Sequence, residues 1–220
     1  MAKLILFGTG DVAQIANYYF GIDSDHEVVC FTVDDAFMNS QTSFEGKPLV
    51  AFEEVAKKYP PSEYKMFIAL SYSKMNKLRE QKYMEAKNRG YDLVSYISSR
   101  CTYLSQFQPG DNCFIFEDNT IQPFVKIGNN VTLWSGNHIG HHSVIESHNF
   151  ISSHVVISGH CTVKPNCFIG VNATIGHQVT IARETLIGAG VVLSKDTVEQ
   201  GVYVPARSVL LDKKSSDIQL

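Results

Sequence analysis

The sequence predicts a mainly β fold, in which a left-handed parallel β-helix follows a small α/β domain of Rossmann-like type. One observation is an aliphatic residue at every sixth position from Ile115 to Leu193, without a break. Such hexapeptide periodicity is typical of a solenoid in which each six-residue unit is one short strand and three units close a triangular coil. The other observation is an alternation of strand-like and helix-like segments ahead of the repeat. We place the α/β domain at 1–100 and the β-helix at 101–220.

Each hexad begins with the aliphatic residue and carries a small or medium residue at its fifth place. The first places are Ile115, Ile121, Ile127, Leu133, Ile139, Ile145, Ile151, Ile157, Val163, Ile169, Ile175, Ile181, Ile187 and Leu193. At the fifth place, as at Asn119 and Val125, the side chain must turn inward where coils stack about 4.8 Å apart, so bulk is excluded. Glycines that directly follow an aliphatic residue are expected at corners where a side chain is dispensable or φ is unusual. They are Gly128, Gly140, Gly170, Gly176 and Gly188.

The first hundred residues carry the pattern of a β-α-β domain. The expected elements are a strand at 3–7, a turn at 8–11, a helix at 12–20, a strand at 28–33, a helix near 52–59, a strand at 66–70, a helix at about 74–89 and a strand at 93–97. This order predicts a small parallel sheet, with the boundary to the solenoid near 98–103.

A nucleotide site is expected at the end of the first two strands. Gly8 and Gly10 form a turn that leads into a helix at Asp11, and Asp34 and Asp35 close the second strand. In α/β sheets such a turn offers backbone N–H groups to phosphate or base, and carboxylates accept hydroxyls. The third glycine of the dinucleotide fingerprint is missing, which favours a smaller nucleotide over NAD. The glycines acting only as a turn, and the carboxylates as a solvated strand end, are the alternatives.

The composition excludes several classes of function. At 220 residues with 44% apolar content, the chain can bury one solenoid core and one small domain. The formal net charge of −3 is spread without runs of either sign, so we expect neither nucleic acid nor a membrane surface as a partner. The five cysteines lack Cys-x-x-Cys spacing and are interpreted as reduced core residues. No segment has signal-peptide or membrane-spanning length, which favours a cytoplasmic protein.

Over nearly its whole length, the chain resembles the hexapeptide sugar-nucleotide acyltransferases, in particular the bacterial 4-amino-sugar N-acetyltransferases of the bacillosamine and perosamine pathways. The resemblance rests on the turn at 8–11, the pair Asp34 and Asp35, the solenoid itself, and three stretches within it. These stretches are 140–141, 166–172 and 187–190. It implies a homotrimer with acetyl-CoA in the groove between adjacent solenoids, a nucleotide-linked amino sugar on the N-terminal domain, and His141 as general base.

The resemblance also assigns cofactor contacts. It places Gly159 near the acetyl group and the main chain of Val171 and Ala189 along the pantetheine arm. Lys195 lies in the last coils, where the phosphates of CoA favour a cation. A histidine suits the base because an imidazole that titrates near neutrality can take the proton of the attacking amine, which is typically worth about 10²–10⁴ in rate.

Two positions depart from the family pattern. The base is commonly followed by Glu or Asp, whereas this chain has His142, and a second family histidine aligns with Phe150. The group that orients the imidazole is therefore open, with Asn137, His138 or a neighbouring subunit as candidates. Asn137 is also a candidate contact to the sugar.

The remaining histidines suggest an alternative. His142, His148, His154 and His160 occupy fourth places and are expected to project from the solenoid, with His142 and His160 stacked one coil apart. His141 and His177 occupy third places two coils apart, which predicts a separation of about 10 Å. A zinc hydratase resembling the γ-class carbonic anhydrases is therefore the alternative, although the N-terminal domain argues against it and we assign no metal ligand.

The sequence therefore predicts an acetyl-CoA-dependent N-acetyltransferase that acts on a nucleotide-linked amino-deoxy sugar for a bacterial surface glycan. No cysteine or serine is placed with a base, which favours direct attack on the thioester. A sugar O-acetyltransferase would use the same groove and base, and a non-enzymatic trimeric scaffold is a third possibility. The sequence does not select among UDP, GDP and dTDP.

Overall fold

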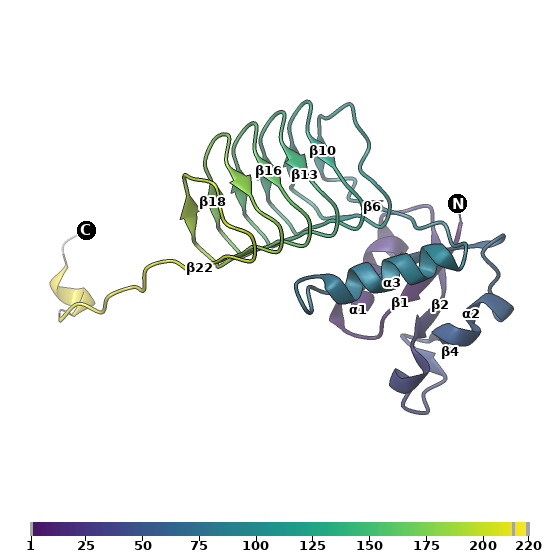
Figure 1. The fold of residues 1–220 in the computed structure, drawn as a ribbon. Coiled ribbons are helices and arrows are strands. Elements are labelled where there is room, and N and C mark those ends of the chain that lie inside the picture. The colour runs from purple at the N-terminus through teal and green to yellow at the C-terminus, as the bar shows by residue number, and fades with distance from the viewer. Residues whose placement is uncertain (1, 213, 219–220) are drawn as a thin grey trace.

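The computed structural model describes residues 2–212 and 214–218, which form a small α/β part beside a solenoid (Figure 1). Its helices are α1 (Asp11–Ile22), α2 (Phe52–Lys58) and α3 (Lys77–Asn88), with short 3₁₀ turns η1 (Asp35–Phe37) and η2 (Ser215–Asp217). The strands of the α/β part are β1 (Lys3–Phe7), β2 (Glu27–Val33), β3 (Ser43–Phe44), β4 (Lys47–Ala51) and β5 (Tyr64–Ile68). Among the described residues, none of the helices has the length and apolar character needed to cross a membrane.

The α/β part contains one sheet with the strand order β3-β4-β2-β1-β5. β1, β2, β4 and β5 are parallel, as the β-α-β pattern predicts, and β3 is the antiparallel edge. α1 packs on this sheet through Ala13, Ala16 and Phe20, which are fully buried and share one helical face. The sequence pattern missed β3 and β4, because β3 has only two residues and β4 opens with Lys47 and Pro48.

The expectation of a strand at 93–97 in the α/β sheet is partly wrong. Leu93 forms only an isolated bridge to Met66, and the strand itself is β6 (Tyr96–Ile97). β6 pairs with β8 (Phe114–Ile115), so it belongs to the solenoid and not to the α/β sheet. The solenoid face therefore begins before residue 100, and our division of the chain at 100 stays a proposal.

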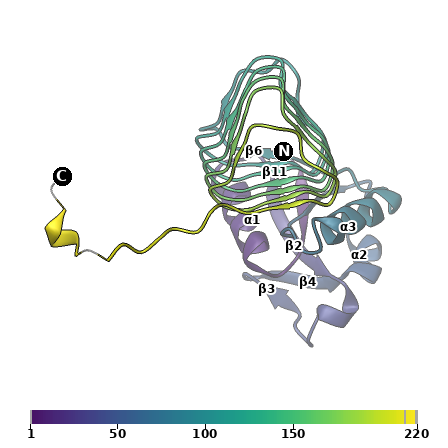
Figure 2. The ribbon, with the colours of Figure 1, turned by 60° about the vertical axis from the view of Figure 1, so that its left-hand side comes forward.

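The solenoid is a triangular prism of three parallel sheets, seen end-on in Figure 2. Face 1 contains β6, β8, β11 (Thr132–Leu133), β14 (Phe150–Ile151), β17 (Phe168–Ile169), β20 (Leu186–Ile187) and β22 (Val202–Tyr203). Face 2 contains β7 (Thr102–Tyr103), β9 (Thr120–Ile121), β12 (His138–Ile139), β15 (Val156–Ile157), β18 (Thr174–Ile175) and β21 (Val192–Leu193). Face 3 contains β10 (Lys126–Ile127), β13 (Val144–Ile145), β16 (Thr162–Val163) and β19 (Thr180–Ile181). The chain passes through the faces in the order 1, 2, 3, which confirms the predicted β-helix.

The repeat fills the core as its pattern predicts. The first-place residues from Ile115 to Ile187 are buried, and so are fifth-place residues such as Asn119 and Val125. Cys161 and Cys167 also fill fifth places and are fully buried, which agrees with their interpretation as core residues. Each coil pairs with the next in strict register, as where Ile139 faces Ile157.

The expectation for the glycines needs a correction. Gly140 and Gly170 follow an aliphatic residue, yet neither has a positive φ. They are glycines because the next coil passes so close: a Cβ on Gly140 would lie 2.5 Å from the backbone nitrogen of Gly159, and one on Gly170 would lie 2.6 Å from that of Ala189. The left-handed conformation occurs instead at the fourth place, for example at His142 (φ 59°) and His160 (φ 58°).

The three edges of the prism differ in what covers them. We call the edge between faces 3 and 1 the covered edge, that between faces 2 and 3 the histidine edge, and that between faces 1 and 2 the open edge. The fourth-place residues of the covered edge are Asn112, Asn130, His148, Asn166 and Glu184. Those of the histidine edge are Phe124, His142, His160 and Gln178. Those of the open edge include Asp118, His154 and Asn172.

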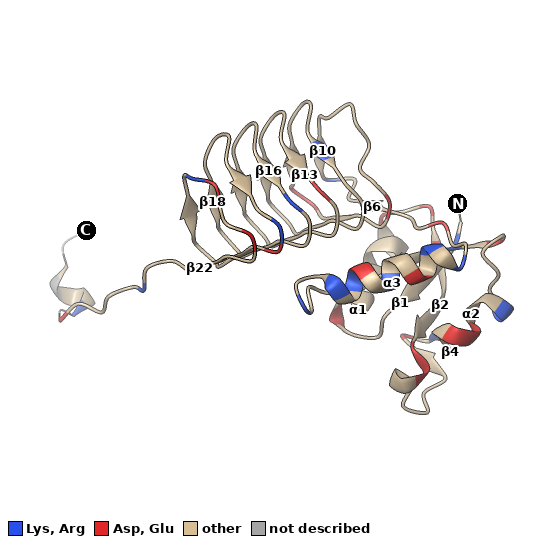
Figure 3. Cartoon of the chain, in the orientation of Figure 1, with Lys and Arg blue, Asp and Glu red and all other residues tan. Residues whose placement is uncertain are grey.

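α3 joins the α/β part to the covered edge through Arg79, whose side chain is 2% exposed. Its guanidinium donates to Oδ1 of Asn130 (3.1 Å) and to the carbonyl oxygens of Asn130 (3.3 Å), His148 (3.4 Å) and Asn149 (3.0 Å). Burial lowers the pKa of Arg79 to about 10, which leaves it charged at neutral pH. Charges of both signs alternate along the rest of α3 (Figure 3).

Candidate functional site

A pocket of about 550 Å³ lies at the carboxyl ends of β1, β2 and β5. It is lined by Gly8, Gly10, Asp34, Lys74 and Lys82, together with apolar side chains. The sheet order places β2 and β5 on opposite sides of β1, and in parallel sheets a reversal of this kind is where ligands bind. We call this the carboxyl-end pocket. It is large enough for a small ligand with a few polar groups.

Gly8 and Gly10 serve different purposes. Gly8 has φ +129°, and a Cβ there would lie 2.7 Å from the carbonyl oxygen of Ala69, so the fold itself requires glycine. Gly10 precedes α1 with an ordinary φ of −96°, and a Cβ there would meet nothing within 4 Å. Because the fold does not require a glycine at position 10, the bare backbone there is suited to a ligand that approaches the start of α1.

The two acidic residues of the predicted nucleotide site also differ in their surroundings. Asp34 lines the carboxyl-end pocket and accepts a hydrogen bond of 2.7 Å from Nζ of Lys82. Burial opposes the charge of Lys82, but the hydrogen bonds that its ammonium donates to Asp34 and Glu85 outweigh this effect, and the pKa of the ammonium is raised. Asp35 is exposed, and its backbone N–H donates to Glu53. The Asp34 carboxylate is therefore held in place beside the pocket.

A second pocket of about 450 Å³ adjoins the first, because Gly10 and Leu70 line both. Asp11 and Tyr72 line it from the α/β part, and Trp134 and Phe150 line it from the solenoid. The indole of Trp134 stacks on Phe116 with ring centroids 4.8 Å apart, and its Nε1 is buried without a hydrogen-bond partner. The indole that lines this space next to the start of α1 therefore carries one donor without a partner.

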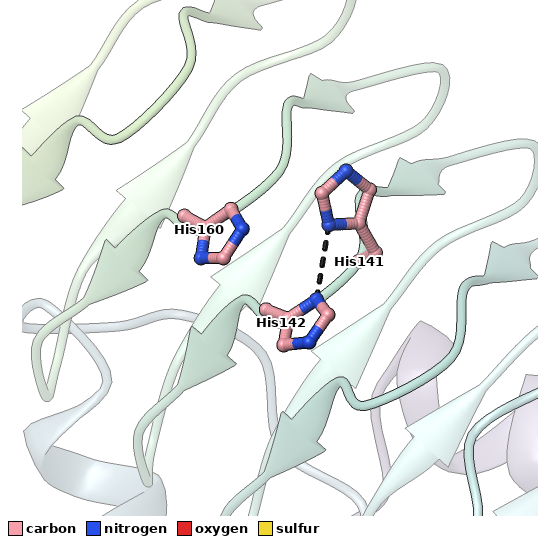
Figure 4. Close-up of side chains that lie close together, drawn as sticks. All are labelled: His141, His142 and His160. Carbon is pink, nitrogen blue, oxygen red and sulfur yellow. Dashed lines mark hydrogen bonds between the residues drawn. The ribbon is translucent and has the colours of Figure 1, made fainter.

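His141 lies elsewhere, on the histidine edge, where its side chain is exposed. A Cβ on Gly159 would lie 2.8 Å from Cε1 and Nε2 of His141, so the ring rests on a glycine of the next coil. Nδ1 of His141 lies 3.0 Å from Nδ1 of His142 (Figure 4). Within the chain, the hydrogen-bond partner of His141 is thus His142, the residue found where the family pattern commonly has a carboxylate.

A cluster of imidazoles surrounds this pair. His142 and His160 stack with ring centroids 4.7 Å apart and planes 9° apart, as their spacing predicts. His141 and His177 have ring centroids 6.5 Å apart, closer than the predicted separation because both side chains lean toward the coil between them. The pKa of His160 is lowered by desolvation and by its three histidine neighbours.

The predicted cofactor residues lie on two different edges. Gly159 and Lys195 occupy third places on the same edge as His141, and Lys195 is exposed. Val171 and Ala189 follow β17 and β20 and therefore lie on the open edge. Both are exposed. A single chain does not bring these two sets together.

The expectations for Asn137 are wrong. Its side chain is 1% exposed, and its Oδ1 accepts a hydrogen bond of 2.7 Å from the backbone N–H of Val155. Its amide nitrogen donates to the carbonyl oxygen of Trp134. Because Asn137 occupies an inward fifth place, it can neither touch a sugar nor orient His141. The sequence already placed Asn137 at an inward fifth position, and that position predicted its burial correctly.

Several residues of the two sites escaped the sequence analysis. Tyr72, Lys74 and Lys82 come from the segment after β5, where three successive residues from Lys74 to Asn76 have positive φ. No glycine marks that turn, so its shape was not readable. Strained backbone of this kind often lies near a functional site.

Comparisons with known proteins agree with this fold. A family model described as bacterial transferase hexapeptide (six repeats) matches residues 124–159 and 160–195. A search of curated proteins found no match. Among solved structures, the acetyltransferase domain of PglB from Neisseria gonorrhoeae FA1090 is 18% identical with a TM-score of 0.76, covering 92% of this chain and 96% of that one.

Two further structures are similar over nearly the whole chain. A mutant of perosamine N-acetyltransferase from Caulobacter crescentus in complex with CoA and GDP-perosamine is 18% identical with a TM-score of 0.77, covering 92% of this chain and 93% of that one. WeeI from Acinetobacter baumannii AYE is 16% identical with a TM-score of 0.75, covering 92% and 94%. The chain therefore carries bacterial transferase hexapeptide repeats and has the fold of the sugar N-acetyltransferases that its sequence resembles.

Proposed function

We propose that the protein is an acetyl-CoA-dependent N-acetyltransferase that acts on the amino group of a nucleotide-linked amino-deoxy sugar. One observation carries the proposal: a single chain combines a carboxyl-end pocket with an exposed imidazole that is held over a glycine on a β-helix edge. The similar perosamine N-acetyltransferase, in complex with CoA and GDP-perosamine, supports the choice of both substrates. A role in surface-glycan synthesis in the cytoplasm belongs to the same proposal.

In the proposed reaction the sugar amine attacks the acetyl carbonyl carbon of acetyl-CoA. A C–N bond forms, the C–S bond breaks, and the proton leaves the amine for His141, which then passes it to the departing thiolate. The hydrogen bond to His142 fixes the ring that performs this transfer. Stabilisation of the tetrahedral oxyanion falls to backbone N–H groups at the corner, such as that of Gly159.

The acceptor is proposed to span both pockets of the α/β part. The diphosphate would lie against the bare backbone at Gly10, with Lys74 as the nearby cation, because the start of a helix favours anions. Asp34 would accept hydroxyls of the nucleoside. The sugar would then reach the adjoining pocket between Asp11 and Trp134.

The complete site requires two copies of the chain. Trp134 and Phe150 belong to face 1, whereas His141 lies on the edge opposite that face. A homotrimer in which the open edge of one copy meets the histidine edge of the next would join the acceptor pocket of one subunit to His141 of its neighbour. It would also join Val171 and Ala189 to Gly159 and Lys195 along one CoA molecule.

The first test measures release of free thiol from acetyl-CoA. We expect release only when a nucleotide amino sugar is added, and thermal shifts with UDP, GDP and dTDP will identify the preferred nucleotide, since a ligand raises apparent stability by mass action. Hydrolysis of acetyl-CoA at the same rate without acceptor would contradict the proposal.

The second test asks whether the site is shared. His141→Ala removes the base, and Gly10→Asn fills the pocket while keeping a good helix cap. Each variant alone should be inactive, but their co-assembled mixture should regain activity, because some sites then combine an intact pocket with an intact histidine. A mixture as inactive as its parts, although the two chains demonstrably co-assemble, would rule out the shared site.

A further inference from the structure

We propose that the histidine edge binds one divalent transition-metal ion through His141, His142 and His160, and that this ion switches off acetyl transfer. The binding site stands on the geometry of the three imidazoles alone. The inhibitory effect rests on the proposed function, because it requires His141 to be the base. A metal site at this edge would couple the activity of the protein to the supply of free zinc.

The three side chains already lie close to a coordinating arrangement (Figure 4). Each offers one ring nitrogen, and these nitrogens all lie within 4.8 Å of one another. Nitrogens bound to one zinc ion at about 2.0–2.1 Å lie roughly 3–4 Å apart. Because all three rings are exposed, side-chain rotation alone can close the difference.

The backbone holds the cluster together without any metal. His142 and His160 occupy left-handed corners of successive coils, so their rings are stacked by the fold. Phe124 lies against the other side of His142, with ring centroids 4.5 Å apart. Two of the three ligands are therefore already close to each other before any ion binds.

The donor set selects the kind of metal. The cluster presents imidazole nitrogens and no carboxylate, a set that suits zinc, copper and nickel rather than magnesium or calcium. The ring of His177 lies 5.5 Å from that of His160 and is the nearest further imidazole. Three histidines with a fourth position left for water or His177 is an ordinary zinc arrangement.

Binding at this site is incompatible with base catalysis by His141. A neutral imidazole has one nitrogen with a free lone pair and one N–H. A metal ion takes the lone pair, whichever nitrogen carries it, and leaves only the N–H. His141 then has no acceptor for the proton of the amine, so acetyl transfer must stop while the ion is bound.

The test uses the full chain without a histidine tag. Zinc binding is measured by competition with a chromogenic chelator, and the cobalt-substituted protein is examined for the visible absorption of tetrahedral Co²⁺. The key variant is His160→Asn. Asparagine tolerates this corner, because Asn172 of the wild-type chain has the same left-handed backbone conformation at another fourth place. His26→Asn makes the same change in the α/β part, outside both edges that form the proposed shared site, and is the control.

We expect one zinc ion per chain in the wild type and in the control. His160→Asn should weaken zinc binding by about tenfold or more, since loss of even a group that only hydrogen-bonds to a metal ligand costs about 10–100-fold. This variant should also retain acetyl transfer at a zinc concentration that inhibits the wild type. Addition of EDTA should restore the activity of the wild type.

Equal zinc affinity of His160→Asn and the wild type would overturn the site. Faster thiol release in the presence of zinc would overturn the inhibitory effect. Zinc binding that depends on His160, in a protein that acetylates no acceptor, would uphold the site and overturn the proposed function. Acetyl transfer that is insensitive to zinc would leave the proposed function standing and overturn the switch.

Discussion

The covered edge and the histidine edge are built from the same corner but place it in opposite surroundings. On both, the fourth residue of a hexad adopts a left-handed conformation, as at His148 and His142. On the covered edge, Asn112 and Asn130 are at most 2% exposed, and α3 packs over them. On the histidine edge, the rings of His141, His142 and His160 are exposed.

The covered edge uses its histidine as a structural acceptor. Oδ1 of Asn130 accepts hydrogen bonds from Arg79 and from Asn112, so its amide nitrogen must face Nδ1 of His148, at 2.9 Å. Nδ1 of His148 is therefore unprotonated. Burial lowers the pKa of this imidazole, although Glu80 opposes the shift. A segment far away in the sequence has thus drawn one corner histidine into the hydrogen-bonded contact between α3 and the solenoid.

The histidine edge leaves its rings free for chemistry. His141 and His142 are hydrogen-bonded to each other, and no part of the described chain covers them. The comparison teaches that the repeat fixes where an imidazole stands, whereas the packing of the α/β part decides which imidazoles stay accessible.

The largest expected effect is on catalysis at the histidine edge. His141→Ala should lower turnover about 10²–10⁴-fold, because the proposed general base is lost, while the proposed trimer should persist. Thiol release with a nucleotide amino sugar measures the loss. His26→Ala, in the α/β part and outside both edges, is the control. Full activity without the His141 imidazole would contradict the catalytic role assigned to the histidine edge.

The next largest effect is on stability at the covered edge. Arg79→Met should lower the free energy of unfolding by about 3 kcal/mol or more, because several buried carbonyl groups lose their donor and each costs about 1–3 kcal/mol. Chemical denaturation measures the change. His160→Asn on the exposed edge should stay within about 0.5 kcal/mol of the wild type. Similar values for the two variants would contradict the distinction between the edges.

A smaller effect is expected from crowding the base. Gly159→Ala places a methyl group where the His141 ring now lies, and should reduce turnover by about tenfold to a hundredfold, since a misplacement of about 1 Å can cost about 10². The double variant with His141→Ala sharpens the test. If Gly159 acts only by seating the ring, the double variant is no slower than His141→Ala alone. An additional loss would show a separate role for the position.

The smallest effect concerns pH and His148. Between the ordinary histidine pKa of about 6.5 and its lowered value, the unfolded state binds a proton that the folded state does not. The free energy of unfolding therefore decreases as pH falls through this window, and this contribution stops changing below it. Urea denaturation at pH about 7.5 and about 5.5 should show a smaller decrease in His148→Asn than in His154→Asn. Equal decreases would indicate that burial does not restrain His148.

The sequence predicted the core and the ring stacking that follow from position within a coil. The aliphatic first places, the inward fifth places and the stacking of His142 on His160 follow from a period of six and three units per coil. It did not reveal which edge is covered, because that depends on contacts such as Arg79 with Asn149, which are 70 residues apart. Nor did it reveal that Gly140 is a glycine because of a neighbouring coil, since that requires the distance between coils.

The candidate site shows the same division. Gly8, Gly10 and Asp34 were predicted because a strand, a turn and a helix are local patterns, and they do line one pocket. The hydrogen bond between His141 and His142 was missed, because the family comparison looked for a carboxylate at that position. Asn137 was misassigned for a related reason: its chemistry suggested a ligand, whereas its place in the hexad required burial.

The left-handed corner has a consequence for engineering. Few residues other than glycine accept this conformation readily, and asparagine and histidine are among them. The prism therefore has regularly spaced fourth-place positions at which a metal-binding or proton-transferring side chain can be introduced with little conformational strain. Gln178 stands one coil beyond His160 in the same column, with φ 62°, so Gln178→His would lengthen the row of rings. New metal-binding or proton-transfer groups can thus be introduced into this scaffold by single substitutions along an existing edge.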